Sequence, residues 1–160
     1  MAPLPTLQIA AASGNVFGYL WKDDAPAGFD GPRWARALCP RGQALGLDGI
    51  FLLDRPQPPG PWRLQHWDAD GSATFCSNGT RAALALAGAP ADGLLPARSN
   101  ETEVLLRRDA AGVGLRMPEG AAYGFLAADL DLTGPWIYGW IGNPQLVIEV
   151  ADVDAIHLPS

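Results

Sequence analysis

The chain has 160 residues, 48% of them hydrophobic, which is enough for one ordinary domain or for one lobe and part of another. Its formal net charge of −6 argues against nucleic acid or an anionic membrane surface as a partner, and no apolar run approaches the roughly 20 residues of a membrane helix. Its two cysteines stand in unlike contexts, which predicts free thiols in a reducing compartment and therefore a cytoplasmic protein.

The first part of the chain predicts short strands separated by turns and one short helix. Ser13-Gly14-Asn15 separates two apolar runs and indicates a hairpin. In WRLQHW, from Trp62 to Trp67, the alternation puts Trp62, Leu64 and His66 on one face of a half-buried strand. The expected elements are strands over 4–12 and 16–21, a helix over 33–38 that Pro40 ends, and strands over 47–53 and 62–67.

The stretch 67–87 carries the clearest chemical signal. Asp70-Gly71-Ser72 is typical of a tight turn, and Cys76 stands shortly before a predicted helix over 80–87. A thiol at that position faces the unpaired N–H groups and the positive end of the helix dipole, which lower a cysteine pKa. The same N–H groups could hold a carboxylate or phosphate. We therefore predict a reactive cysteine beside an anion-binding helix start.

The remainder predicts more strands. Residues 88–96 are typical of a loop, 103–107 and 113–117 of a second hairpin, and 135–150 of two apolar strands broken by Gly142-Asn143-Pro144. The fold class expected from these patterns is α+β, with mixed β structure around one central helix.

Four segments, taken in this order, resemble diaminopimelate epimerase over nearly all of this chain but over only part of the family's usual length. They are SGN at 13–15, LDGIFLL at 47–53, DADGSATFCSNGTRAA at 68–83, and IGNPQLVIEVADVDAI at 141–156.

The resemblance implies a cofactor-independent amino-acid epimerase or racemase of lysine and peptidoglycan-precursor metabolism, with neither cofactor nor metal. It implies two lobes, each a barrel-like sheet wrapped around a central helix, with the substrate between them. Residues 1–120 would form the first lobe and 121–160 the start of an incomplete second lobe. One cysteine from each lobe would face each side of the α-carbon and transfer its proton.

Carried over by position, Cys76 matches the first catalytic cysteine. The implied substrate-binding positions are Asn15, Asp68, Ser77, Asn78, Gly79 and Asn143. Three positions depart from the family pattern: Asp68 replaces an asparagine, Ser77 a glycine and Gln145 a histidine. An aspartate at position 68 should repel a second carboxylate on the substrate, which questions diaminopimelate itself as the substrate.

Several sites have a simpler structural interpretation. Cys76 could be a buried structural thiol, Asn78 a helix cap and Asp68 a turn residue, whereas a packed strand residue is the favoured interpretation of His66. Arg81 is expected to make structural hydrogen bonds more readily than to bind a substrate.

No segment matches the family's second catalytic motif, and Cys39 is expected at the wrong end of its helix to be the second base. We therefore expect a homodimer, or pairing with a chain that supplies the second lobe. Two alternatives stay open. One is a same-fold isomerase of the proline-racemase or phenazine-isomerase type acting on another small acid. The other is a catalytically inactive lobe or fragment that pairs with another chain.

Overall fold

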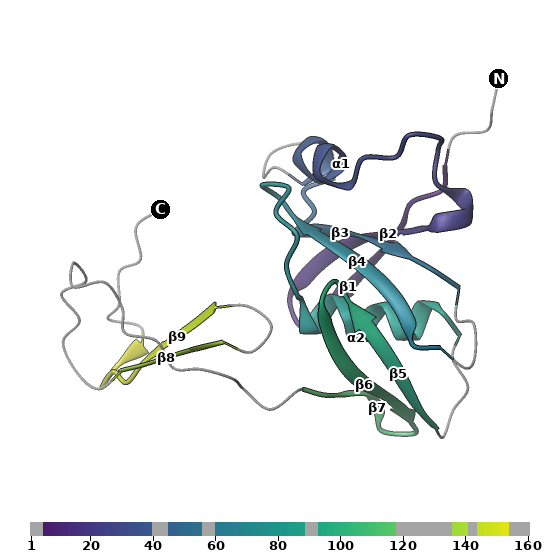
Figure 1. The fold of residues 1–160 in the computed structure, drawn as a ribbon. Coiled ribbons are helices and arrows are strands. Elements are labelled where there is room, and N and C mark those ends of the chain that lie inside the picture. Colours follow the sequence, from purple (N-terminus) through teal and green to yellow (C-terminus); the bar gives the residue numbers. More distant parts are fainter. Residues whose placement is uncertain are drawn as a thin grey trace. The chain divides into compact units, whose positions relative to one another are not determined.

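The computed structural model describes residues 5–39, 45–55, 60–88, 93–117, 136–140 and 144–153 (Figure 1). Two compact units divide the chain, one over residues 1–118 and the other over 119–160. The elements of the first unit are β1 (Gln8–Ala12), β2 (Asn15–Trp21), η1 (Lys22–Asp24), α1 (Gly31–Leu38), β3 (Gly49–Leu53), β4 (Trp62–Asp68), α2 (Ser77–Leu86), β5 (Gly93–Ser99), β6 (Thr102–Asp109) and β7 (Gly112–Arg116).

Seven strands form one mixed sheet in the order β1-β2-β3-β4-β5-β6-β7. The pairs β2–β3 and β4–β5 are parallel and the other neighbouring pairs are antiparallel. A parallel pair needs a long crossover, and here the two crossovers contain α1 and α2 respectively. The predicted α+β class with a mixed sheet is confirmed.

The first hairpin turns at Ser13 and Gly14, whose φ angles are 50° and 87°. Two successive positive φ values are typical of the tight hairpin turn that matches the right-handed twist of the strands. Asn15 pairs with Ala12, so it begins β2 and is not part of the turn as the sequence suggested.

The two helices cover opposite faces of the sheet. Helix α2 packs against β1 and β2 at one end of the sheet and against β6 and β7 at the other, so the sheet curls around it as predicted (Figure 1). Helix α1 packs against β3 and β4. Neighbouring residues of β3 point to opposite faces of the sheet. Phe51 belongs to the core cluster on the α2 side, and Ile50 belongs to the cluster on the α1 side.

The strand β4 follows its predicted alternation. Trp62, Leu64 and His66 are buried, and His66 is 0% exposed. The interpretation of His66 as a packed strand residue is therefore confirmed.

The sequence predicts a loop over 88–96, whereas β5 begins at Gly93. Along β5, only Ala97, Arg98 and Ser99 pair with β4, so Pro96 lies where that side of the strand has no β4 neighbour. Proline, which lacks an N–H, is tolerated at such an edge position.

The second unit contains β8 (Trp136–Trp140) and β9 (Pro144–Ile148), which pair antiparallel as expected. Asn143 and the predicted turn around it lie outside the described residues. The assignment of 1–120 and 121–160 to two epimerase lobes stays a prediction.

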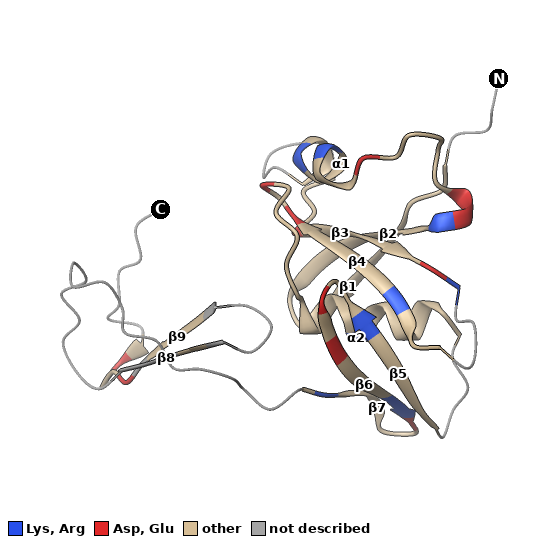
Figure 2. Ribbon diagram, in the orientation of Figure 1, with Lys and Arg blue, Asp and Glu red and all other residues tan. Residues whose placement is uncertain are grey.

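Charged residues are spread over several elements of the first unit. Figure 2 shows Lys and Arg on η1, α1, β4, β5 and β6, interspersed with acidic residues. Exposed pairs such as Lys22–Asp54 and Arg98–Glu101 link some of them. In the part of the chain that the structure describes, neither helix is long and apolar enough to cross a membrane.

Candidate active site

Cys76 is the N-cap of α2, which begins at Ser77, three residues earlier than the sequence suggested. Its extended backbone, with φ −126° and ψ 110°, brings the sulfur back over the first turn, where it accepts a hydrogen bond from the Gly79 N–H at 3.5 Å. The Cys76 carbonyl accepts from the Thr80 N–H at 3.0 Å and from its hydroxyl at 2.7 Å. The cysteine is thus the cap, and the interpretation of Asn78 as the cap is wrong.

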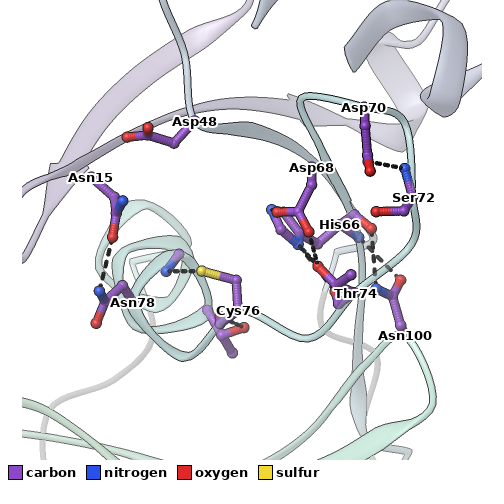
Figure 3. Close-up of polar contacts among 12 residues, drawn as sticks. Asn15, Asp48, His66, Asp68, Asp70, Ser72, Thr74, Cys76, Asn78 and Asn100 are labelled. Carbon is purple, nitrogen blue, oxygen red and sulfur yellow. Dashed lines mark hydrogen bonds and ion pairs between the residues drawn. The ribbon is translucent and has the colours of Figure 1, made fainter. Parts of the chain in front are cut away.

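The thiol of Cys76 is half-buried, and burial raises its pKa above the ordinary value. The backbone N–H groups of Gly79 and Asn78 lower that pKa, and so does the charge of Arg81, whereas the Asp68 carboxylate raises it. Burial outweighs the favourable N–H groups, so the pKa moves in the opposite direction to the one predicted. The Gly79 N–H, one of the groups expected to hold a substrate anion, points at the sulfur in this structure (Figure 3).

A hydrogen bond joins two predicted binding residues, Asn15 at the start of β2 and Asn78 in the first turn of α2. The Asn78 side-chain amide donates to Asn15 Oδ1 at 3.0 Å, although the two residues are 63 positions apart (Figure 3). Arg81 donates to Asn78 Oδ1 at 2.6 Å and to Ser13 Oγ at 2.9 Å. The first hairpin turn is therefore joined to the start of α2 by a continuous polar network.

Gly79 and Ser77 occupy the first turn of α2. A Cβ atom at Gly79 would lie 2.2 Å from Cε2 of Phe51, so ring packing requires a glycine there even without a ligand. The Gly79 carbonyl accepts a hydrogen bond from the Tyr19 hydroxyl at 3.0 Å. Ser77 is half-buried as the first helical residue.

Asp68 ends β4 on the other side of Cys76. Its Oδ2 accepts a 2.5 Å hydrogen bond from the Thr74 hydroxyl, and its Oδ1 lies 3.7 Å from Nε2 of His66. Its backbone also closes the predicted turn, since its N–H donates to the Ser72 carbonyl at 2.9 Å. Asp68 is therefore both a turn residue and a partly exposed carboxylate near the thiol.

Sequence reasoning missed Asn100, which holds the segment before Cys76 against β4. Its side-chain Oδ1 accepts from the His66 N–H at 3.1 Å, and its Nδ2 donates to the carbonyls of His66 and Thr74. Its φ of 50° places it in a tight turn between β5 and β6. A turn asparagine was the available signal, but its partners are 34 and 26 positions away.

Cys39 is unsuited to proton transfer in this structure. It lies at the C-terminal end of α1, is 1% exposed, and has a pKa that burial raises to about 11. Among the described residues, no group of three or more His, Cys, Asp or Glu side chains could hold a metal ion.

No protein-family model matches the chain. A diaminopimelate epimerase from Prochlorococcus marinus (strain MIT 9313) is 43% identical over 51 residues, which cover 31% of this chain and 17% of that protein. A diaminopimelate epimerase from Methanothermobacter thermautotrophicus is 28% identical over 153 residues, which cover 79% of this chain and 52% of that protein. The chain resembles diaminopimelate epimerase.

These matches confirm the resemblance predicted from the four segments. The chain spans about half the length of the Methanothermobacter diaminopimelate epimerase that it matches, and a smaller share of the Prochlorococcus protein. The crystal structure of a methylitaconate-delta-isomerase superimposes with a TM-score of 0.44 at 12% identity, covering 89% of this chain and 69% of that one.

Proposed function

We propose that the chain is the first lobe of a cofactor-independent amino-acid epimerase of the diaminopimelate epimerase type, with Cys76 as one of two acid–base groups. The observation that carries the proposal is a half-buried thiol at the start of the central helix, with the Gly79 N–H directed at its sulfur. The names of the two relatives suggest diaminopimelate as the first candidate substrate, and lysine and peptidoglycan-precursor metabolism as the setting.

In the proposed reaction a thiolate removes the α-hydrogen as a proton. The electron pair of the C–H bond stays on the α-carbon and delocalises into the adjacent carboxylate, and an acid on the opposite face then returns a proton and inverts the centre. N–H groups at the start of α2 and the Arg81 guanidinium would stabilise the negative charge that grows on the carboxylate. Because burial raises the pKa of Cys76, its resting form near pH 7 is the thiol, which serves as the proton donor.

The opposing base must lie on another lobe under this proposal. The only other cysteine in the sequence is Cys39, which is buried in the cluster on the α1 side of the sheet. We propose that a second copy, or a chain carrying a second lobe, supplies that base, and that the protein acts in the cytoplasm.

Hydrogen exchange at the α-carbon tests this function. The chain is incubated in D2O with diaminopimelate and with neutral and basic amino acids, and deuterium incorporation is followed by mass spectrometry. We expect incorporation that Cys76→Ser abolishes and that Cys39→Ser leaves intact. Equal exchange in Cys76→Ser would contradict the role of Cys76. No exchange in the unmodified chain would contradict supply of the base by a second copy, and would favour either a separate second-lobe chain or the inactive binding lobe.

A second candidate, a same-fold isomerase acting on another small acid, is favoured by Asp68. Its side chain is 44% exposed beside the proposed catalytic thiol, where it disfavours a substrate with a second carboxylate. The same exchange measurement distinguishes the two, since this candidate predicts deuterium in neutral or basic amino acids but not in diaminopimelate.

A further inference from the structure

The Asp68 carboxylate is held in place by its neighbours. Oδ2 accepts the Thr74 hydroxyl hydrogen bond at 2.5 Å, while Oδ1 faces His66 Nε2 at 3.7 Å, too far for a hydrogen bond. The side chain is 44% exposed. Asp68 therefore presents a positioned oxygen to the solvent without a cation bound to it among the described residues.

His66 does not neutralise this carboxylate. Its Nδ1 lies 3.0 Å from the Thr74 carbonyl, which can only accept, so Nδ1 carries the proton and Nε2 has a lone pair. Nε2 is buried and has no hydrogen-bond partner among the described residues. The ring stacks on Phe51 at 4.4 Å between centroids, and burial lowers its pKa, so His66 is neutral at pH 7.

Polar and charged residues flank the thiol on both sides. In Figure 3 the Asn15–Asn78 pair and the Asp68–Thr74 pair lie on opposite sides of Cys76. Arg81 is bound to Asn78 on the first side, whereas Thr74, which holds Asp68, is two residues before Cys76 in the sequence. Asp48, whose Oδ2 accepts from the Val16 N–H at 2.7 Å, adds a carboxylate on the Asn15 side, so that side carries both signs of charge. Asp68 is the carboxylate whose charge acts on the Cys76 thiol.

We propose that Asp68 is a specificity-determining residue that favours molecules with a cationic group at its side of Cys76 and disfavours those with a second carboxylate there. As a statement about substrates this rests on the proposed function, and it names basic amino acids as the favoured class. As a statement about the thiol it holds for any reagent that must approach Cys76, because a nearby charge acts on every approaching ion.

Charged thiol reagents test the proposal on the chain itself. Methanethiosulfonates bearing a trimethylammonium, a sulfonate or no charge are reacted with Cys76, and the modified site is assigned by mass spectrometry. The readout is the cation-to-anion rate ratio relative to a small free thiol, because a change in the Cys76 pKa alters both rates equally. We expect this ratio to exceed that of the free thiol and to fall at least about threefold in Asp68→Asn.

Asp70→Asn is the matched control. Asp70 lies in the same turn, accepts from the Ser72 N–H at 2.7 Å and faces solvent, so its substitution should leave the ratio unchanged. An unchanged ratio in Asp68→Asn, or an equal fall in Asp70→Asn, would overturn the proposal. Should Asp68→Asn not fold, the pair Asp68→Glu and Asp68→Gln replaces it, with the cation preference expected in the charged variant alone.

The reagent test separates this proposal from the proposed function. A preference for the cationic reagent that depends on Asp68 supports the specificity role of Asp68 even if no α-hydrogen exchange is found. Conversely, exchange that needs Cys76 together with a ratio insensitive to Asp68 would leave the epimerase proposal standing and remove the specificity role.

Discussion

The two helical crossovers of the sheet each place a cysteine at a helix end, with different chemical results. Cys39 closes α1, where its backbone N–H donates to Ala35 and its side chain is 1% exposed. Cys76 opens α2, is half-buried, and receives the Gly79 N–H on its sulfur. A helix start presents free donors and a helix end presents free acceptors, so only the second thiol faces N–H groups that favour its anion, although burial still raises its pKa.

The charged and polar groups around the two thiols reinforce this difference. The pKa of Cys39 is raised first by burial and then by the charges of Asp48 and Asp68. At Cys76 burial and Asp68 act in the same direction, but two N–H groups and Arg81 oppose them. One face of the sheet thus carries a buried thiol whose pKa is only raised by its surroundings. The other face carries a thiol at a helix start, where N–H groups and Arg81 partly offset the effect of burial on its pKa.

The largest expected contrast is in alkylation of the native chain. Iodoacetamide should modify Cys76 more than about a hundredfold faster than Cys39, because reaching Cys39 requires α1 to open from the sheet, and each 1.4 kcal/mol of opening slows reaction about tenfold. Mass spectrometry of timed digests measures both rates. In urea the two rates should converge, whereas similar rates in the native chain would contradict the comparison.

Each helix also has a glycine in its first turn against an aromatic ring of the sheet. A Cβ at Gly79 would lie 2.2 Å from Phe51, and one at Gly31 would lie 2.4 Å from Trp67. Phe51 is 1% exposed and stacked between Tyr19 and His66, whereas Trp67 is only partly buried.

We therefore expect Gly79→Ala to lower the free energy of unfolding by about 1–3 kcal/mol, and Gly31→Ala to lower it less. Urea unfolding followed by circular dichroism measures both. Gly114→Ala is the control, because no atom lies within 4 Å of a Cβ there, and its effect should stay within about 0.5 kcal/mol. A larger loss of unfolding free energy in Gly31→Ala than in Gly79→Ala would contradict this prediction.

The smallest expected effect concerns charge. The positive charge of Arg81 lowers the pKa of Cys76. The pKa of Cys39 is set by burial, Asp48 and Asp68 instead. Arg81→Gln should therefore raise the pKa of Cys76, moving the rise of its alkylation rate with pH to higher pH, and leave Cys39 unchanged. Arg55→Gln, which removes an exposed partner of Asp23, is the control. A profile that moves to lower pH would show that Arg81 does not act through its charge.

Patterns of short period predicted the fold well. Alternation in WRLQHW identified the buried face of β4, and turn residues located the hairpins before β2 and β7, because these features depend on neighbours one or two residues away. The strand β5 was missed, since a proline within it suggested a loop until its neighbours along the sheet were known.

The site was predicted less completely. Cys76, Asn15 and Asn78 were proposed as site residues through the resemblance to diaminopimelate epimerase, and that role stays a prediction. The bond between the two asparagines joins positions 63 apart. The contact of Asp68 with Thr74 and the contribution of Asn100 also depend on how β4 meets the turn that follows it. Such side-chain contacts leave no periodic signal in a single sequence.

The sequence by itself determined that a cysteine would stand close to the start of the central helix of a mixed sheet, because turn and helix preferences are local. The tertiary structure decided how that thiol behaves. Burial raises the pKa of Cys76 despite the helix N–H groups, and the ending of β4 brings a carboxylate near it. Desolvation and through-space charge depend on segments far apart in the chain, so no local pattern could have set their balance.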